Sequence, residues 1–508
     1  MIITAKEQRT AEARAVEKGV SLIRLMQTAG ESVFSVLREG YELKDLAVCA
    51  LCGNGGNGGD GFVAARMLKQ AGARPVIVLC SGTPKANAPS LMYKQAVSEG
   101  VPVLDIQFER EKVFDAVSKS GLIIDAVYGI GFRGKLNASM DALFREVNRT
   151  RAPTVAVDVP SGVNADTGEA DENAVRADIT VCFIAKKPAN ILKSARLYCG
   201  TSVLADIGIP EECLAALNNE LKEIDAGTAA KILSPRPEIG HKGDFGRLMI
   251  TAGSDRYRGA AVIAALGAYQ TGAGLVAVAS AEKALSAVAA KVPEAILFDI
   301  CSDKEDYIGE LKKSGACLIG CGLTTTAKAK ELFTLTLGNA ACPLVIDADG
   351  LNLLASDPSL FELLDERTIL TPHIGEFSRL TGMAAEEILK DRVKHAREYA
   401  VKHGITLALK SENTVVATAD GRAYINTIGN SGLAKAGSGD LLAGMTAALL
   451  AMGKSPVDAA VAGVYLHSLA ADLATEEVDK HSLTASYISG YIGGAYAKIF
   501  SDPAVCDE

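Results

Sequence analysis

Short apolar runs alternate with amphipathic stretches over the first 210 residues of the chain. Residues 21–37 carry Leu22, Leu25 and Ala29 at helical spacing, which predicts a helix packed on a core. Two more helices are predicted at 62–71 and 89–99. Strands are predicted at 46–51, 75–80, 101–104, 122–127, 154–159 and 179–184. This alternation predicts a parallel sheet with helices on both faces.

A second strand and helix alternation follows residue 238. Between the two alternations, residues 210–238 look helical and polar and end in two closely spaced prolines, which interrupt regular structure. We therefore predict two domains, 1–212 and 213–508. The second domain is predicted to contain helices at 259–272, 440–451 and 457–473. Its strands are predicted at 247–252, 275–279, 317–320, 344–346, 368–370, 406–409 and 414–417.

Composition narrows the class of protein and its partners. A chain of 508 residues with 48% hydrophobic and 22% charged residues is typical of folded domains, and its net charge of −9 disfavours nucleic acid and anionic membranes. The N-terminus lacks an apolar signal core, and no apolar run looks long enough to span a membrane. We expect a cytoplasmic homo-oligomer that acts on small molecules.

The eleven cysteines include one close pair, Cys49 and Cys52. A C-x-x-C pair is compatible with redox or metal chemistry. Here the pair lies in an apolar run at 46–52 and no second pair completes a metal site, so a buried strand is the favoured interpretation. Free thiols fit a reducing compartment.

A glycine-rich motif, Gly53-Asn-Gly-Gly-Asn-Gly-Gly-Asp-Gly61, follows a predicted strand and precedes a predicted helix. Glycines let the backbone approach an anionic ligand, and the helix N-terminus offers free N–H groups. A pyrophosphate or ribose phosphate would fit there. A tight turn without a ligand is the alternative, which six glycines in nine residues disfavour.

Two other motifs end at the same edge of the predicted sheet. Residues 123–131 contain Asp125 and lead into a glycine turn, and residues 157–163 lead into a Pro-Ser-Gly turn with Ser161. Ligands of open α/β sheets bind at the carboxyl ends of strands. Each residue alone is more often a cap or turn residue, but Asn57, Asp125 and Ser161 together predict oxygen ligands for a hard cation.

The C-terminal half has its own glycine motif, Gly437-Ser-Gly439, followed by Asp440 at the start of a helix. Backbone N–H groups there would face phosphate oxygens. Asp440 is predicted to be a general base beside this anion hole, and a helix N-cap is the alternative.

Three further C-terminal motifs leave alternatives open. Lys242, next to a glycine, is compatible with either a phosphate contact or a solvated loop. His373 follows a strand and is either a ligand contact or a satisfied loop histidine. The carboxylates within 347–352 are predicted to be site-edge or capping groups.

The N-terminal motifs together resemble the NAD(P)H-hydrate epimerase family over nearly all of residues 1–210. The resemblance implies a Rossmann-like three-layer fold and a potassium ion held by Asn57, Asp125 and Ser161. It also implies a role for Asp158 in substrate binding and catalysis. The chain has Gly56-Asn57 where the family usually has two asparagines, which removes one side-chain contact. The implied contacts of the hydrated nucleotide are Gly56, Asn57, Gly58, Gly59, Asp60, Gly129, Ile130, Gly131, Phe132, Arg133, Gly134, Lys135 and Asp158.

The C-terminal motifs resemble the ADP- or ATP-dependent NAD(P)H-hydrate dehydratases from about residue 224 onwards. This resemblance implies a ribokinase-like α/β fold and a magnesium ion bound with ADP or ATP. Ser411 departs from the Lys-Gly start usual in the family and adds a side chain near the nucleotide. The hydrate contacts that it implies are Ala260, Gly322, His373 and Asp440. The nucleotide contacts that it implies are Lys410, Ser411, Glu412, Asn413, Thr414 and Gly439.

Together the two resemblances imply nicotinamide cofactor repair. The first domain is expected to interconvert the R and S forms of hydrated NADH or NADPH. The second is expected to dehydrate the S form at the expense of ADP or ATP. The alternative is a ribokinase-like vitamin-precursor kinase fused to a non-enzymatic nucleotide-binding adaptor.

Overall fold

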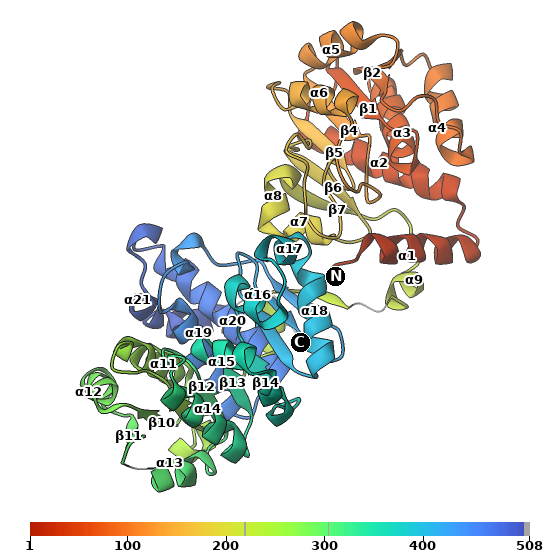
Figure 1. The fold of residues 1–508 in the computed structure, drawn as a ribbon. Coiled ribbons are helices and arrows are strands. Elements are labelled where there is room, and N and C mark those ends of the chain that lie inside the picture. The colour runs from red at the N-terminus through yellow and green to blue at the C-terminus, as the bar shows by residue number, and fades with distance from the viewer. Residues whose placement is uncertain (218–219, 303, 502–508) are drawn as a thin grey trace. The chain divides into compact units, whose positions relative to one another are not determined.

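The chain folds into two compact units, Met1–Asn219 and Glu220–Glu508, which divide slightly after the predicted position (Figure 1). The structure is a computed structural model and describes residues 1–217, 220–302 and 304–501. We call the two parts unit 1 and unit 2. Each has its own sheet, so the predicted α/β class is confirmed for both.

The sheet of unit 1 has seven parallel strands in the order β3-β2-β1-β4-β5-β6-β7. Six were predicted, and the edge strand β7 was not. Its side chains are mostly exposed or half-buried and give no apolar run. The strands are β1 (Ala47–Cys52), β2 (Arg74–Leu79), β3 (Val103–Asp105), β4 (Leu122–Ala126), β5 (Thr154–Val157), β6 (Ile179–Phe183) and β7 (Thr201–Ala205).

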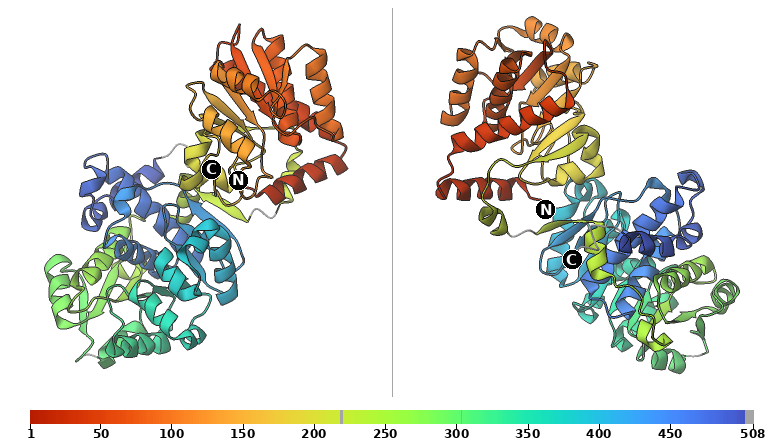
Figure 2. Two further views of the ribbon diagram at one scale, coloured as in Figure 1. Left: turned by 45° about the horizontal axis from the view of Figure 1, so that its top comes forward. Right: turned by 180° about the vertical axis from the view of Figure 1, so that it is seen from behind.

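Helices cover both faces of this sheet, giving three layers (Figures 1 and 2). Alternate residues of β1 enter the two cores, with Val48 and Ala50 on one side and Cys49 and Leu51 on the other. Helices α2, α3 and α4 pack on the first face, and α5 and α6 on the second. The helices are α1 (Ala5–Glu17), α2 (Leu22–Gly40), α3 (Gly56–Gln70), α4 (Asn87–Ser98), α5 (Arg110–Ser118), α6 (Ala138–Val147), α7 (Pro188–Ile191), α8 (Lys193–Cys199) and α9 (Glu211–Ala215).

Helix α3 begins inside the glycine motif, at Gly56, rather than at residue 62 as predicted. A Cβ at Gly58 would lie 1.9 Å from the carbonyl oxygen of Gly53, and one at Gly61 would lie 2.6 Å from the Cβ of Ala126. The glycines therefore allow the first turns of α3 to pack directly against β1 and β4. The predicted start of this helix was too late, because glycines, which are poor helix formers, are tolerated where packing demands them.

The predicted strand at 154–159 ends early, at Val157. Asp158 has a φ of 65°, a left-handed conformation that cannot continue a strand. This turn places the Asp158 side chain at the carboxyl edge of the sheet.

The sheet of unit 2 has ten strands in the order β11-β10-β9-β12-β13-β14-β15-β16-β17-β8. Neighbours are parallel, except that β16 runs antiparallel to both β15 and β17. Strands β8, β11 and β17 were not predicted. The strands are β8 (Leu221–Ile224), β9 (Arg247–Thr251), β10 (Leu275–Ser280), β11 (Ile296–Asp299), β12 (Ala316–Ile319), β13 (Leu344–Ile346), β14 (Thr368–Leu370), β15 (Thr406–Leu409), β16 (Val415–Ala417) and β17 (Ala423–Asn426).

The main core of unit 2 lies around α11, α19 and α20, which are rich in alanine and buried on most sides. The helices of this unit are α10 (Ala226–Ile232), α11 (Arg258–Thr271), α12 (Glu282–Lys291), α13 (Lys304–Leu311), α14 (Ala327–Asn339), α15 (Asp349–Ser356), α16 (Ile374–Thr381), α17 (Ala385–Lys390), α18 (Arg392–His403), α19 (Ser438–Ala451), α20 (Pro456–Ala474), α21 (Ala485–Ser489) and α22 (Ile492–Phe500). Short 3-10 helices occur at Lys242–Phe245, Pro358–Leu363, Ser431–Leu433 and Lys480–Ser482.

Two predictions were wrong: that residues 210–238 are helical, and that no apolar run is long enough to span a membrane. Residues 210–238 are not simply helical, because β8 lies between α9 and α10 and pairs with β17, far along the sequence. One helix, α20, is also long and apolar enough to cross a membrane by length and composition. Because 78% of its apolar window is buried inside unit 2, α20 is a core helix of that unit.

Candidate nucleotide-binding and catalytic sites

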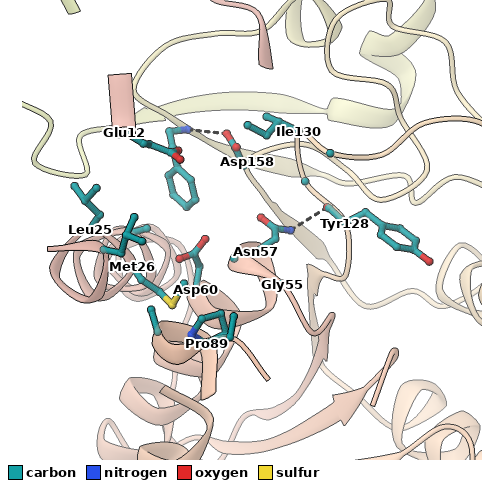
Figure 3. Close-up of a pocket in the computed structure, with 18 of the residues that line it drawn as sticks. Glu12, Leu25, Met26, Gly55, Asn57, Asp60, Pro89, Tyr128, Ile130 and Asp158 are labelled. Carbon is teal, nitrogen blue, oxygen red and sulfur yellow. Dashed lines mark hydrogen bonds between the residues drawn. The ribbon is translucent and has the colours of Figure 1, made fainter. Parts of the chain in front are cut away.

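A cavity of about 680 Å³ opens at the carboxyl edge of the unit 1 sheet (Figure 3). Its lining comes from α1, α2, the start of α3 and the turns after β4 and β5. The predicted contacts that line the cavity are Gly56, Asn57, Asp60, Gly129, Ile130, Gly131, Phe132 and Asp158.

The other predicted contacts of unit 1 do not line the cavity. Gly58 and Gly59 are buried residues in the first turn of α3. Arg133 is exposed and pairs with Asp166 at 2.6 Å, and its neighbours Gly134 and Lys135 are also exposed. Their contact with the substrate stays a prediction.

The predicted cation ligands converge on one turn. Ser161 donates its hydroxyl to Asp125 Oδ1 at 2.5 Å and its backbone N–H to Asp125 Oδ2 at 2.6 Å. The Ser161 hydroxyl oxygen accepts the N–H of Tyr128 at 2.8 Å, and Asn57 donates to the Tyr128 carbonyl at 2.9 Å. The dashed line from Asn57 to Tyr128 in Figure 3 marks the second of these bonds. Asn57 and Ser161 therefore bond to the Tyr128 backbone, and Asp125 is held beside them through Ser161.

Asp125 carries an uncompensated negative charge when ionised. It is fully buried, and burial raises its pKa to about 6 although Ser161 and Val127 donate hydrogen bonds to it. No lysine or arginine of the described ranges forms an ion pair with it. Carboxylate, amide and hydroxyl oxygens beside such a charge fit the donor set of a potassium ion.

Carboxyl groups gather on the α1 side of the cavity. Asp158 pairs with the buried ammonium of Lys187 and accepts bonds from Gln8 Nε2 at 3.0 Å and from the Phe183 N–H at 3.2 Å. Gln8 Nε2 also donates to Glu12 at 3.1 Å. Burial raises the pKa of Glu12, and the negative charge of Asp158 raises it further.

Sequence reasoning missed the contribution of α1 to this site. Gln8, Arg9 and Glu12 line the cavity, yet α1 gives only a weak apolar pattern, because its buried face is mostly alanine. A capping box between Thr4 and Glu7 was the one signal that marked the start of the helix.

In unit 2, Asp440 lies in the first turn of α19 beside a cluster of polar groups. Oxygen and sulfur atoms of Cys321, Asp347 and Asp440 lie within 4.8 Å of one another. Burial raises the pKa of Asp440 to about 6, and the charge of Asp347 contributes. Lys410 Nζ donates to Asp347 Oδ1 at 2.6 Å, and a Cβ at Gly439 would lie 3.1 Å from Lys410 Nζ. The carboxyl group of Asp440, the ammonium group of Lys410 and the N-terminus of α19 therefore lie close together.

A second cavity, of about 470 Å³, opens beside Asp440. Ala260, Gly322 and Asp440, three of the four predicted hydrate contacts, line it. His373 does not, because its Nδ1 accepts the N–H groups of Gly375 and Glu376 and caps α16. Its contact with the hydrate stays a prediction. The lining that was missed includes Arg256 and Tyr257, just before α11, and Arg258, its first residue.

The predicted nucleotide loop is only partly available to a ligand. Asn413 is buried and donates to the carbonyl of Asn426 at 2.9 Å, so it holds the loop. Glu412 pairs with the nearly buried Arg392, and Ser411 donates to the Asn413 carbonyl at 2.7 Å. Of the predicted nucleotide contacts in this loop, Lys410 reaches toward Gly439. Thr414 is half-buried and directly precedes β16.

The fold and the two cavities define a class: a two-unit α/β protein in which each unit has a helix that starts in a glycine motif and carboxyl groups that line a cavity. A family model described as YjeF-related protein N-terminus matches residues 22–189, and one described as NAD(P)H-hydrate dehydratase matches residues 248–493. The chain belongs to the family of bifunctional NAD(P)H-hydrate repair enzymes.

Two relatives have that name, and each aligns with this chain over almost its full length. One, from Coxiella burnetii, is 34% identical over 95% of this chain and 96% of its own. Another, from Thermofilum pendens, is 34% identical over 99% of this chain and 97% of its own. A solved structure of a ribokinase-like superfamily protein from Enterococcus faecalis has a TM-score of 0.51 and 26% identity, covering 56% of this chain and 98% of that one. These findings favour cofactor repair over the kinase and adaptor alternative.

Proposed function

We propose that this chain repairs hydrated NADH and NADPH at two sites. Unit 1 interconverts the R and S epimers, and unit 2 removes water from the S form with the help of ADP or ATP. One observation carries the proposal: each unit places a carboxyl group, Asp158 or Asp440, in a cavity beside a helix that starts in a glycine motif. The proposed location is the cytoplasm and the proposed assembly a homo-oligomer.

For the dehydratase, we assign Asp440 as the general base. Its half-buried carboxyl lines the cavity beside Ala260 and Gly322, where the hydrated ring would lie. The nucleotide phosphate would lie against the first N–H groups of α19 and the ammonium of Lys410. Phosphate transfer from the nucleotide to the ring hydroxyl would make it a better leaving group. Departure of this phosphate together with a proton from the neighbouring ring carbon would restore the double bond, with Asp440 accepting the proton. Asp347, whose carboxyl lies close to that of Asp440, offers oxygen ligands of the kind that a nucleotide-bound magnesium ion prefers.

For the epimerase, we assign the potassium ion to Asn57, Asp125 and Ser161. The buried charge of Asp125 supports this assignment, because a bound cation would offset the cost of ionising it. The ion would fix the turn at Tyr128, whose neighbours Gly129 and Ile130 line the cavity.

The test uses the full chain with purified R or S hydrate of NADH, with ADP, ATP or no nucleotide. We expect recovery of the dihydronicotinamide absorbance only with nucleotide, and interconversion of the epimers, followed by chromatography, without it. A chain that restores no cofactor with either nucleotide would contradict the proposal. Phosphorylation of a vitamin precursor in the same preparation would instead support the kinase alternative.

A further inference from the structure

Asp60 is a buried carboxyl group with no partner, and it lies in the cavity of unit 1. Its residue is 8% exposed, and within the described part of the chain its side chain has neither a hydrogen bond nor an ion pair. In Figure 3 the carboxyl points into the space between Glu12, Asn57 and Asp158. An unpartnered buried carboxyl is costly and needs an explanation.

The groups around Asp60 favour its neutral form. Leu25 and Met26 line the same cavity and supply apolar surface. Burial raises the pKa of Asp60 well above its usual value, and the charges of Asp158 and Glu12 raise it further. The cations in this region are Lys187, which pairs with Asp158, and Arg9, which lies near Glu12.

The other two carboxyl groups are differently placed. Asp158 forms an ion pair with Lys187 and accepts hydrogen bonds from Gln8 and from the Phe183 N–H. Glu12 accepts from Gln8 and is only half-buried. The cavity therefore contains one carboxyl without a partner, Asp60, and another paired with a buried lysine, Asp158, an arrangement that separates acid and base roles.

The chemistry of the hydrated ring needs an acid at this place. Water adds to the ring carbon next to the ring nitrogen, because the nitrogen lone pair stabilises a cation there. The hydroxyl-bearing carbon is then a hemiaminal. Loss of its hydroxyl as water forms a carbon–nitrogen double bond with a positive charge, and this planar cation can be attacked from either face.

We propose that Asp60 is the proton donor in epimerisation: its neutral carboxyl protonates the hydroxyl that leaves the hydrated carbon. The carbon–oxygen bond breaks, water is released, and the nitrogen lone pair forms the double bond. The Asp158 carboxylate stabilises the cation electrostatically. Water then adds to the opposite face and returns its proton to Asp60, so only the configuration changes. This inference rests on the proposed epimerase function of unit 1.

The decisive variant is Asp60→Asn in the full chain, assayed without nucleotide so that dehydration does not remove the product. Asparagine has nearly the same shape and is neutral, so the fold should be kept. We expect the epimerisation kcat, corrected for the spontaneous rate, to fall at least about a hundredfold. The KM for the R hydrate should change less than about threefold, because the residue acts mainly in the transition state. Asp115→Asn, at an exposed residue of α5, is the matched control and should behave as wild type.

The pH profile separates a proton donor from a structural residue. Wild-type kcat should fall as pH rises above the raised pKa of Asp60, because the acid is then lost. The residual rate of Asp60→Asn should lack this decrease. A wild-type rate that does not fall with rising pH would overturn the inference even if the variant failed to fold.

The outcomes distinguish this inference from the proposed function. If wild type does not epimerise above the spontaneous rate, the epimerase proposal fails. If wild type epimerises and a folded Asp60→Asn does so equally well, only the proton-donor role fails. A variant whose KM rises while kcat is kept would show that Asp60 merely binds substrate and would also overturn the inference.

Discussion

The ammonium group of Lys187 is buried between the carboxylate of Asp158 and the carbonyl oxygen of Phe183, to which it donates at 2.8 Å. Lys187 is fully buried and its partner Asp158 nearly so. Removing one partner of such a pair leaves an uncompensated buried charge. The ion pair holds the Asp158 side chain in place at a turn where the backbone of Asp158 adopts a left-handed conformation.

We therefore expect Lys187→Met to destabilise unit 1 by about 3–5 kcal/mol and to abolish epimerisation. The measurement is denaturant unfolding of the full chain, with unit 1 followed by hydrogen exchange. Lys112→Met, at an exposed lysine on α5, is the control and should change stability by less than about 0.5 kcal/mol. Equal stabilities of the two variants would show that the buried pair has no structural role.

Asp440→Asn should abolish dehydration while epimerisation continues. The substitution keeps the size of the side chain but removes the base, so the dehydration kcat should fall about a hundredfold or more. Cofactor recovery from the S hydrate with ADP or ATP measures it. Near-normal dehydration by the variant would contradict the assignment of Asp440.

The pH dependence of dehydration follows from the same carboxyl group. Its pKa is raised to about 6, so the base is protonated and inactive below that pH. We expect dehydration kcat/KM to rise with pH through about 6 and then level off. A profile that is flat between pH 5 and 8 would count against Asp440 as the base, provided that the fold is intact by circular dichroism at pH 5.

Asp125→Ala should impair conversion of the R hydrate but leave dehydration of the S hydrate unchanged. Loss of the carboxylate removes the only charged ligand of the proposed potassium set. Wild-type epimerisation should respond to potassium chloride but not to choline chloride, more strongly above pH 6 where Asp125 is ionised. Unchanged R turnover in the variant would refute the ion site.

The sequence was sufficient to predict that Asp125 and Ser161 lie together, because the carboxyl ends of neighbouring parallel strands must meet. Asp125 lies next to the last residue of β4, and Ser161 follows β5. Glu12 could not be predicted, because the folding of α1 over that edge depends on long-range packing of an alanine face. The same holds for β8, whose partner β17 is about 200 residues away, too far for any local pattern to indicate.

The two units should work when separated, provided that the cut respects β8. Each has its own sheet and buried core, so each should fold alone. A cut after residue 212 would divide α9 and remove the buried Cys213 and Leu217 from unit 1. We expect fragment 1–219 to epimerise the hydrate and fragment 220–508 to dehydrate the S form with nucleotide.

Fragment 225–508 lacks β8 and should be less stable, since β17 then becomes an exposed edge. Mixing fragments 1–219 and 220–508 should restore use of the R hydrate above the spontaneous rate. Folded but inactive fragments would show that each site needs the other unit.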